Sequence, residues 1–357
     1  MSKLLDKLRK NTTLKHVDIM SDSTFFNDKD VATTDVIILN LALSGSIHGG
    51  VTPGLTTIAA PSAHFKSLLG LFMVSAYMKK HKDAICLFYD SEFGSPPEYL
   101  KNYDIDIARV LHCPVTSLED LRTDMTNQVK DIGRDDKVVI FIDSLGNLAS
   151  LKETKDAEEG NAAADFTRAK VLKSTFRIIT PQLLLKDIPC ICINQVYDSM
   201  DKYNPHTMSG GSGLRFASNT VFFMSKSQEK DGTELAGYKF TIIANKSRAV
   251  REKSKFPLTV LFDTGINKYS GLLDLAIELE FVKKPSMGWY SRVIDGVMED
   301  KKWRAKDTNS AEFWDVLLND PKFDEACGER YKLGSGGEPD LDNLDDDIDL
   351  DDIDIDE

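Results

Sequence analysis

The chain has 357 residues, of which 41% are hydrophobic and 28% are charged, with a formal net charge of −13. This length suits one large domain with appendages, and the apolar fraction can bury a substantial core. No apolar run approaches a membrane span, and charged residues interrupt the N-terminal leucines, so we expect neither a membrane protein nor a secretory signal. The five cysteines and six histidines lack metal-ligand spacing. We therefore expect reduced thiols, a cytoplasmic location and no zinc or iron site.

The negative charge is concentrated at the C-terminus. Residues 338–357 hold twelve carboxylates and no basic side chain, which leaves the rest of the chain with a net charge of −1. Gly334-Ser-Gly-Gly337 is typical of a flexible linker, and the spaced leucines and isoleucines after it favour a disordered segment that reads a partner. The overall charge therefore does not argue against nucleic-acid binding by the body of the chain.

Periodicity divides the chain into four parts. Residues 1–30 form a separate N-terminal segment, with an amphipathic helix around Leu4–Arg9. Up to about residue 280, short apolar runs alternate with helical stretches, which predicts an α/β fold whose mostly parallel sheet is flanked by helices. The expected strands are Leu55–Ala60, Ala84–Tyr89, Val138–Ile142, Ile188–Ile193, Val221–Met224, Phe240–Ile243 and Leu258–Phe262. The expected helices are Ser67–Lys80, Ser117–Ile132, Asp165–Leu185 and Leu272–Leu279. Residues 281–333, where basic and aromatic residues interleave, form a small C-terminal module, and residues 334–357 form the linker and acidic tail.

The first apolar run opens directly into a helix through a loop with the features of a phosphate loop. In such a loop the backbone amides and the helix N-terminus face an anion. Lys66 would reach the β- and γ-phosphates of a nucleotide, and the Ser67 hydroxyl would bind Mg²⁺. Ala60 and Phe65 stand where the usual pattern has glycines, which is compatible with binding if both residues take negative φ. An ordinary exposed turn is the alternative reading. The candidate loop comprises Ala60, Pro61, Ser62, Ala63, His64, Phe65, Lys66 and Ser67.

Three later strands also end in polar side chains. Glu92, just after the second strand, can direct and deprotonate an attacking water. Asp143 ends the next buried strand and would bind Mg²⁺ directly or through water. Gln195 follows the strand after that and could sense the γ-phosphate. Because parallel strands end at one sheet edge, the four strand ends together form a stronger signal than any one of them.

These segments resemble a RecA-family recombinase, most closely the UvsX recombinases of bacteriophages. The likeness runs over most of residues 20–333, and it is densest at Leu87–Gly94, Val138–Ala149, Gly210–Gly213, Lys246–Arg248 and Tyr269–Asp274. The resemblance implies an ATP- and Mg²⁺-dependent, DNA-dependent ATPase. Such an enzyme forms helical homo-oligomeric filaments on single-stranded DNA, admits double-stranded DNA and exchanges strands in recombination, repair and replication.

The resemblance also implies residue roles. Glu92 matches the residue that activates water, and Tyr99 matches the aromatic residue that stacks on adenine, although a packed helix-face tyrosine is equally common. Lys246 and Arg248 match basic residues that reach the ATP of the neighbouring subunit; a solvated strand end is the alternative. Residues 1–30 would serve oligomerisation.

Two loops resemble the DNA-binding loops of the family. The first spans about Leu151–Phe166, with Arg168 just beyond it as a phosphate contact. The second spans about Val196–Ser212 and ends at Gly210, Gly211 and Ser212, where the backbone can approach DNA phosphates. Arg215 and Phe216 would lie near the subunit interface, although Phe216 could equally be core.

Two other functions share these features. A ring helicase has the same core but usually carries an additional N-terminal domain that thirty residues cannot supply. A DNA-binding scaffold with a decayed ATPase would explain Ala60 and Phe65, but the joint retention of Lys66, Ser67, Glu92 and Asp143 argues against it. A phage-encoded recombinase would work in the host cytoplasm, with a recombination mediator and a single-strand-binding protein as partners.

Overall fold

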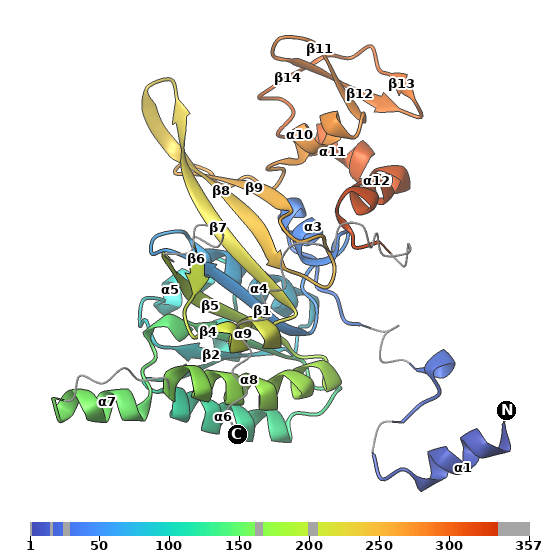
Figure 1. Cartoon of the computed structure of the whole chain (residues 1–357). Helices are drawn as coiled ribbons and strands as arrows, with labels where there is room; N and C mark the ends of the chain where they lie inside the picture. The colour runs from blue at the N-terminus through green and yellow to red at the C-terminus, as the bar shows by residue number, and fades with distance from the viewer. Residues whose placement is uncertain (1, 15–16, 24–28, 161–166, 199–205, 335–357) are drawn as a thin grey trace, which may run out of the picture.

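Alternating apolar runs and helices assemble around one large sheet (Figure 1). The computed structural model describes residues 2–14, 17–23, 29–160, 167–198 and 206–334. The strands of the large sheet are β1 (Gly54–Ala60), β2 (Ile85–Asp90), β3 (Val110–Pro114), β4 (Val138–Asp143), β5 (Pro189–Asp198), β6 (His206–Met208), β7 (Thr220–Asp231), β8 (Glu234–Lys246), β9 (Lys255–Leu261) and β10 (Gly265–Ile266). Their order is β10-β9-β8-β7-β1-β5-β4-β2-β3, with β6 paired to β5.

The strands from β3 to β7 in this order run parallel, and β8, β9 and β10 continue the sheet antiparallel. This arrangement confirms the mostly parallel α/β fold predicted from the sequence. The edge strand β3 was not predicted, because its half-exposed residues do not form an apolar run. The β7–β8 hairpin is much longer than the two short runs that predicted it, because residues 225–231 of β7 are all polar and give no apolar run.

The helices before and between these strands are α3 (Ile37–Ser44), α4 (Lys66–Lys80), α5 (Pro97–Lys101), α6 (Leu118–Asp131), α7 (Leu151–Glu158), α8 (Thr167–Leu185) and α9 (Ser212–Ala217). Alternate residues of one strand enter different hydrophobic clusters. Val139 and Phe141 pack on the side of α4, whereas Ile140 and Ile142 pack on the side of α6 and α8. Burial on both faces explains why the parallel strands read as continuous apolar runs.

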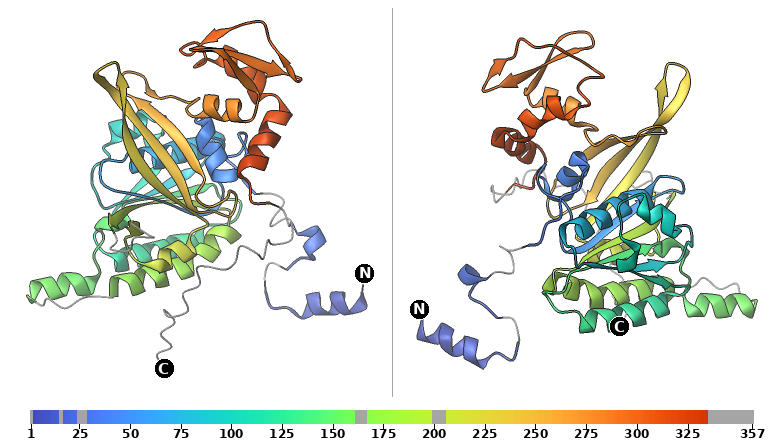
Figure 2. Two further views of the ribbon diagram at one scale, coloured as in Figure 1. Left: turned by 45° about the horizontal axis from the view of Figure 1, so that its top comes forward. Right: turned by 180° about the vertical axis from the view of Figure 1, so that it is seen from behind.

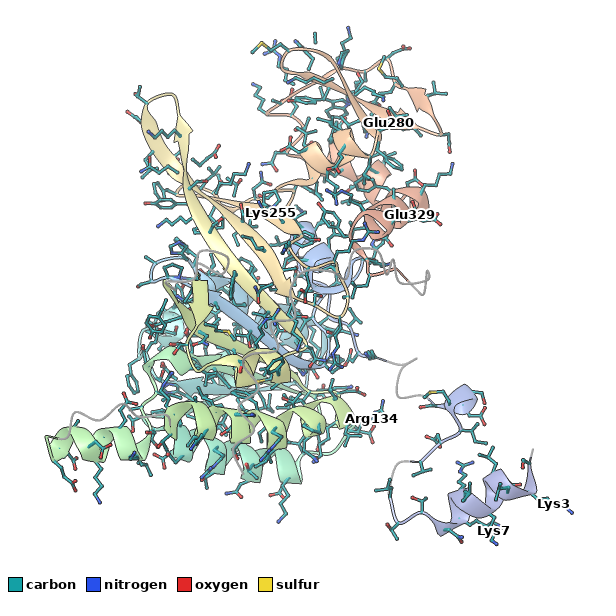
Figure 3. All side chains as sticks on the ribbon, viewed as in Figure 1. Lys3, Lys7, Arg134, Lys255, Glu280 and Glu329 are labelled. Atoms are coloured by element: carbon teal, nitrogen blue, oxygen red, sulfur yellow. The ribbon has the colours of Figure 1, made fainter. Side chains whose placement is uncertain are left out.

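The two ends of the chain differ in how they contact the core. Helix α1 (Lys3–Asn11) has no buried residue, and Figure 3 shows Lys3 and Lys7 on it, away from the sheet. The C-terminal part consists of α10 (Leu272–Glu278), β11 (Val282–Ser286), β12 (Trp289–Ile294), β13 (Val297–Met298), β14 (Trp303–Arg304), α11 (Ala311–Leu318) and α12 (Pro321–Tyr331) (Figure 2). The Asp324 carboxylate accepts hydrogen bonds from Ser46 Oγ and the Ile47 amide, both at 2.8 Å, which ties α12 to the segment after α3. No helix within the described ranges is long and apolar enough to cross a membrane.

Candidate functional site

The carboxyl ends of four adjacent strands bring the predicted polar residues to one edge of the sheet. Ala60 of β1 pairs with Gln195 of β5, and Asp90 of β2 pairs with Asp143 of β4. Strands β1, β5, β4 and β2 are successive neighbours in the sheet, so these four residues follow one another along the edge. The sequence therefore placed Gln195 and Asp143 correctly, while their chemical roles stay predictions.

The loop between β1 and α4 holds Lys66 at the first turn of the helix. Its side chain is largely buried, and Nζ donates a 2.9 Å hydrogen bond to the Pro61 carbonyl. Burial lowers the pKa of Lys66, while the nearby Glu92 and Asp143 carboxylates raise it. An ammonium in this position can exchange a backbone carbonyl for phosphate oxygens.

Two residues of this loop have the left-handed backbone conformation that favours glycine. Ala63 has φ 58° and Phe65 has φ 53°. Phe65 therefore does not meet the condition of negative φ, whereas Ala60 does not have a positive φ. A left-handed conformation costs a non-glycine residue about 1–2 kcal/mol. The Phe65 ring packs edge-on against Phe240 of β8, with centroids 5.1 Å apart, and this contact offsets part of that cost.

Asp143 has the environment of a cation ligand. Burial raises its pKa to about 7; the Glu92 and Asp90 carboxylates raise it as well, while a hydrogen bond with Ser67 and the Lys66 ammonium lower it. Its Oδ1 atom is buried without a hydrogen-bond partner. An unpartnered carboxylate oxygen beside a hydroxyl fits a hard cation such as Mg²⁺, which prefers oxygen ligands and would keep the carboxyl ionised.

Few other protein ligands are available to such a cation. In the described part of the chain, no three or more His, Cys, Asp or Glu side chains form a group that could hold a metal ion. A Mg²⁺ ion bound through Ser67 and Asp143 would therefore complete its coordination with water and phosphate oxygens, as Mg²⁺ usually does.

Glu92 lies just after β2, and its position is controlled by two neighbours. The Asp90 carboxylate accepts hydrogen bonds from the amides of Glu92 and Phe93 at 3.0 and 2.7 Å, which shapes the turn. Ser144 Oγ donates a 2.8 Å hydrogen bond to Glu92 Oε1. A carboxylate held in this way can orient a water molecule and accept its proton.

A cavity of about 330 Å³ lies over the candidate phosphate loop and is lined by most of the predicted nucleotide residues. Tyr99 of α5 reaches it, which fits the predicted contact with adenine, although its ring also packs edge-on against Tyr103. Lys226 of β7 lines the cavity as well, and sequence reasoning missed it because no motif surrounds it. The lining residues are Ser62, Ala63, His64, Phe65, Lys66, Ser67, Leu68, Glu92, Tyr99, Gln195 and Lys226.

Gln195 connects this cavity to the second predicted DNA loop. Its Nε2 donates to Asn147 Oδ1 at 3.0 Å, and its carbonyl accepts a 3.0 Å hydrogen bond from the Ser209 amide. A Cβ atom on Gly146 would lie 2.7 Å from Cγ of Gln195, so the absence of a side chain there makes room for this amide. A movement of Gln195 would therefore displace its hydrogen-bond partners in η3 (Leu145–Asn147) and at Ser209.

The two predicted DNA loops are partly regular structure. Helix α7 occupies Leu151–Glu158, where a loop was expected, and it begins with a capping box formed by Ser150 and Glu153. Strand β5 continues to Asp198 and pairs with β6, so the second loop begins as a β-hairpin. Residues 161–166 and 199–205 of the predicted loops lie outside the described residues.

The glycines that end the second loop have the expected backbone freedom. Gly210 and Gly211 have φ 91° and 74°, and Ser212 begins α9. A Cβ atom on Gly210 would lie 2.3 Å from Cδ1 of Leu172, so α8 packs against the loop at this point. Both the backbone conformation and the close approach therefore require glycine at Gly210.

Arg168 has protein partners in place of the expected DNA phosphate. Its guanidinium donates to the carbonyls of Leu148 and Leu145 at 3.0 and 2.8 Å, and to Ser209 Oγ at 2.8 Å. These bonds connect the segment after Asp143 with the end of the second loop. These bonds indicate that Arg168 positions these two segments, while its expected contact with a DNA phosphate stays a prediction.

Lys246 and Arg248 do not line the cavity of their own chain. Lys246 Nζ donates to the carbonyls of Arg215 and Phe216 at 2.9 and 3.0 Å, while Arg248 is exposed. Phe216 is 68% exposed, so the alternative that it belongs to the core is wrong. An exposed aromatic residue beside two cations fits the predicted subunit contact.

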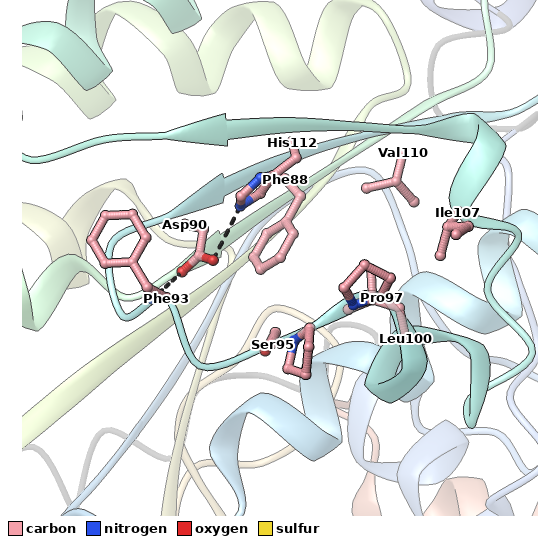
Figure 4. Close-up of a pocket in the computed structure, with 10 residues that line it drawn as sticks. Phe88, Asp90, Phe93, Ser95, Pro97, Leu100, Ile107, Val110 and His112 are labelled. Atoms are coloured by element: carbon pink, nitrogen blue, oxygen red, sulfur yellow. Dashed lines mark hydrogen bonds and ion pairs between the residues drawn. The ribbon is translucent and has the colours of Figure 1, made fainter.

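A second cavity of about 340 Å³ lies between α5 and β3 (Figure 4). The Asp90 carboxylate meets His112 Nε2 there at 3.1 Å, so one side chain shapes both the Glu92 turn and this cavity. The other lining residues are mostly apolar. Sequence reasoning missed this cavity because it did not predict β3.

The C-terminal module uses part of its basic and aromatic composition internally. Trp303 is buried and donates from Nε1 to Glu299 at 2.8 Å, and Arg292 is buried in an ion pair with the same carboxylate. Trp303 therefore packs inside the module and is not part of its surface. Lys284 and Arg304 remain exposed beside Tyr290 and Trp289, respectively.

Comparison with known proteins identifies the family. Residues 3–267 match the RecA N-terminal domain, and residues 269–327 match the C-terminal domain of the bacteriophage T4 recombination and repair protein. The recombination and repair protein of Enterobacteria phage T4 is 50% identical over 341 residues, which cover 94% of this chain and 87% of that protein. RecA proteins of Chlorobaculum tepidum and Chlorobium limicola are 26% and 27% identical over 76% and 68% of this chain, and over 77% and 68% of their own lengths. The likeness to the phage branch expected from the sequence is confirmed. The chain belongs to the RecA family of DNA-dependent ATPases, the recombinases that pair homologous DNA and exchange its strands in recombination and repair.

Proposed function

We propose that this recombinase binds ATP with Mg²⁺ in the cavity over the phosphate loop. Lys66 would bind the β- and γ-phosphates, and Ser67 and Asp143 would hold the Mg²⁺ ion, which neutralises developing phosphate charge when bound. Glu92, oriented by Ser144, would accept a proton from water. Tyr99 would pack against the adenine ring.

The single observation that supports this site best is the unpartnered Oδ1 of Asp143. It lies on a carboxyl whose pKa is lowered by Ser67 and Lys66 and raised by Glu92. A buried carboxylate oxygen without a partner is costly unless a ligand satisfies it. A decayed ATPase would have no need to keep a buried carboxylate beside Ser67, Lys66 and Glu92.

Lys246 and Arg248 would complete the site of a neighbouring subunit. Both lie outside the cavity of their own chain, and Phe216 is exposed beside Lys246. In a filament, two cations delivered across the interface would stabilise charge on the transferred phosphoryl group as an arginine finger does. Residues 1–30, whose helix α1 buries no residue of its own, would contribute to oligomerisation.

Single-stranded DNA would contact the backbone at Gly210, Gly211 and Ser212. The filament would then admit double-stranded DNA and exchange strands with it. The second loop follows directly from the strand that carries Gln195, and the Ser209 amide is bonded to the Gln195 carbonyl. This connection gives the γ-phosphate sensor a short route to the DNA-binding backbone. Phosphate contacts of this kind fix the register of the DNA without reading its sequence, which suits a protein that accepts any homologous pair.

The remaining proposals concern partners and location. The acidic residues 338–357, which lie outside the described residues, would dock on a recombination mediator or a single-strand-binding protein, or would compete with DNA. A phage-encoded protein of this kind would act in the cytoplasm of the host cell.

The deciding experiment measures ATP turnover and strand exchange with and without single-stranded DNA, in the parent protein, in Lys66→Met and in Lys79→Met. Lys79 is a matched control at the other end of α4. We expect DNA-stimulated turnover in the parent and Lys79→Met, and its loss in Lys66→Met. Absence of turnover in the parent would support a decayed scaffold, and 5′–3′ unwinding by closed hexamers would support a helicase.

A further inference from the structure

The phosphate loop contains two strained residues that are contacted from one cross-strand pair. Ala63 and Phe65 have positive φ angles of 58° and 53° without being glycine. Lys226 Nζ of β7 donates a 3.2 Å hydrogen bond to the Ala63 carbonyl, and the Phe240 ring of β8 packs on Phe65. Lys226 and Phe240 are direct partners in the β7–β8 ladder, so their side chains leave the same face of the hairpin.

The position of Lys226 is itself defined by packing. Its Nζ lies 3.8 Å from the ring centroid of Tyr238, which is on β8 two residues before Phe240. A cation over a tyrosine face is attracted by the ring and has fewer accessible rotamers. The ammonium is therefore directed at the loop, and the side chain is only partly exposed.

We propose that Lys226 is a positioning residue for the nucleotide site. By binding the Ala63 carbonyl, it holds the phosphate loop in the left-handed conformation that a glycine would adopt without cost, and Phe240 does the same for Phe65. The antiparallel hairpin thus supports two left-handed residues of the loop, of which Phe65 stands at a position where the usual pattern has glycine. This inference rests on the proposed ATP site, and it assigns to Lys226 an action on the loop backbone in place of one on the phosphates.

The test first removes the Lys226 ammonium. It then replaces Ala63 by glycine, which adopts a positive φ without this contact. Lys226→Met should weaken binding of a fluorescent ATP analogue about tenfold, because a charged hydrogen bond that holds the loop is removed. The Michaelis constant for ATP should rise similarly, with little change in kcat. Lys226→Arg should retain binding. Lys230→Met, an exposed lysine further along the same strand, is the matched control and should bind as the parent does.

The decisive variant adds Ala63→Gly to Lys226→Met. Glycine takes positive φ without a Cβ penalty, so the double variant should recover most of the affinity that Lys226→Met loses, and Ala63→Gly alone sets the affinity against which this recovery is measured. Circular dichroism and thermal unfolding of each variant ensure that only folded proteins are compared.

Each remaining outcome contradicts a different claim. If the parent and Lys226→Met bind ATP equally well, the positioning role is overturned. If Lys226→Met binds ATP weakly and Ala63→Gly does not restore its binding, the positioning role is also overturned, and a direct contact between Lys226 and phosphate explains the loss. If the parent itself does not bind ATP, the proposed nucleotide site is overturned first and the inference fails with it.

Discussion

Ser144 Oγ donates a 2.8 Å hydrogen bond to Glu92 Oε1, and so connects the residue after Asp143 on β4 with the acidic residue after β2. Ser144 is held in turn by Ser91, whose Oγ donates to the Ser144 carbonyl at 2.7 Å and accepts from its amide at 3.0 Å. The candidate base and the candidate Mg²⁺ ligand therefore belong to one hydrogen-bonded unit. Neither can shift without disturbing the other.

Glu92→Gln is expected to keep ATP and DNA binding but to lose turnover by about 10²–10⁴-fold, since the carboxylate is needed only to accept the proton of water. Equilibrium binding of nucleotide and single-stranded DNA, measured beside steady-state hydrolysis, checks this. Glu98→Gln, an exposed glutamate of α5, is the control and should be neutral. Hydrolysis by Glu92→Gln near the parent rate would remove Glu92 as the base.

Arg248→Ala and Lys246→Ala should each lower DNA-stimulated turnover and filament length together, because both cations would act on the neighbouring subunit. Mixing Arg248→Ala with Glu92→Gln tests this directly. In a mixed filament about a quarter of the interfaces combine an intact Glu92 with an intact Arg248 from the next subunit, since a head-to-tail interface uses different surfaces of its two subunits. The mixture should therefore hydrolyse more ATP than either variant alone. A mixture no more active than its components would place Arg248 in the site of its own chain.

The strand ends were predictable, while the contacts that support them were not. Asp143 and Gln195 could be placed because a buried parallel strand is a continuous apolar run, and all such strands end at one edge. Lys226 could not be found, because its contact with Ala63 depends on the register of a long hairpin whose polar outer part gives no strand signal. The fold class needed only the pattern of runs.

The start of α7 and the turn at Asp90 could have been predicted from residues close together in the sequence. Ser150 and Glu153 form the spacing of a capping box, which indicates the start of α7 within the expected DNA loop. Asp90 ends β2 as Asp143 ends β4, and its hydrogen bond with the Glu92 amide is local, whereas its contact with His112 depends on the unpredicted strand β3. The burial of Trp303 likewise depends on Glu299, a partner that composition cannot reveal.

Arg168→Gln is expected to weaken single-stranded DNA binding without changing its dependence on salt. The guanidinium holds the Leu145 and Leu148 carbonyls and Ser209, so its removal would loosen both DNA-binding segments. Removal of a phosphate-binding cation would instead reduce the slope of log K against log salt by about 0.7. Lys170→Gln, which removes an exposed charge from the same helix, is the control. A slope reduced only in Arg168→Gln would restore Arg168 as a ligand of DNA phosphate.

The C-terminal module, residues 281–333, is expected to bind duplex DNA through its exposed cations. Deletion of the module is unsuitable, because Phe313, Trp314 and Phe323 are buried in the same hydrophobic cluster as α3 and β9. Substitution of Lys284, Lys302 and Arg304 by glutamine avoids this problem, since all three are exposed. The salt slope on duplex DNA should fall by about 0.9 for each phosphate that these side chains no longer neutralise.

A matched substitution, Lys322→Gln, removes an exposed lysine that pairs with Asp295 on the same module. It should leave the duplex slope unchanged. If the three-site variant also keeps the parent slope, the module does not bind DNA through these cations, and the packing of Trp289 and Tyr290 beside them serves stability alone.

Removal of residues 338–357 is expected to tighten duplex binding, and most strongly at low salt. The segment carries twelve carboxylates behind a glycine-rich linker, so it is attracted to the same cations as DNA at a high effective concentration. The gain should shrink as the Debye length falls from about 30 Å at 0.01 M salt to about 8 Å at 0.15 M. Duplex titrations of the full chain and of a chain ending at Gly337 across this range measure the effect. A version with the twelve acidic residues changed to Asn and Gln separates charge from length, because only the charge competes with DNA. Equal affinities at low salt would rule out competition and leave a docking or solubility role for the segment.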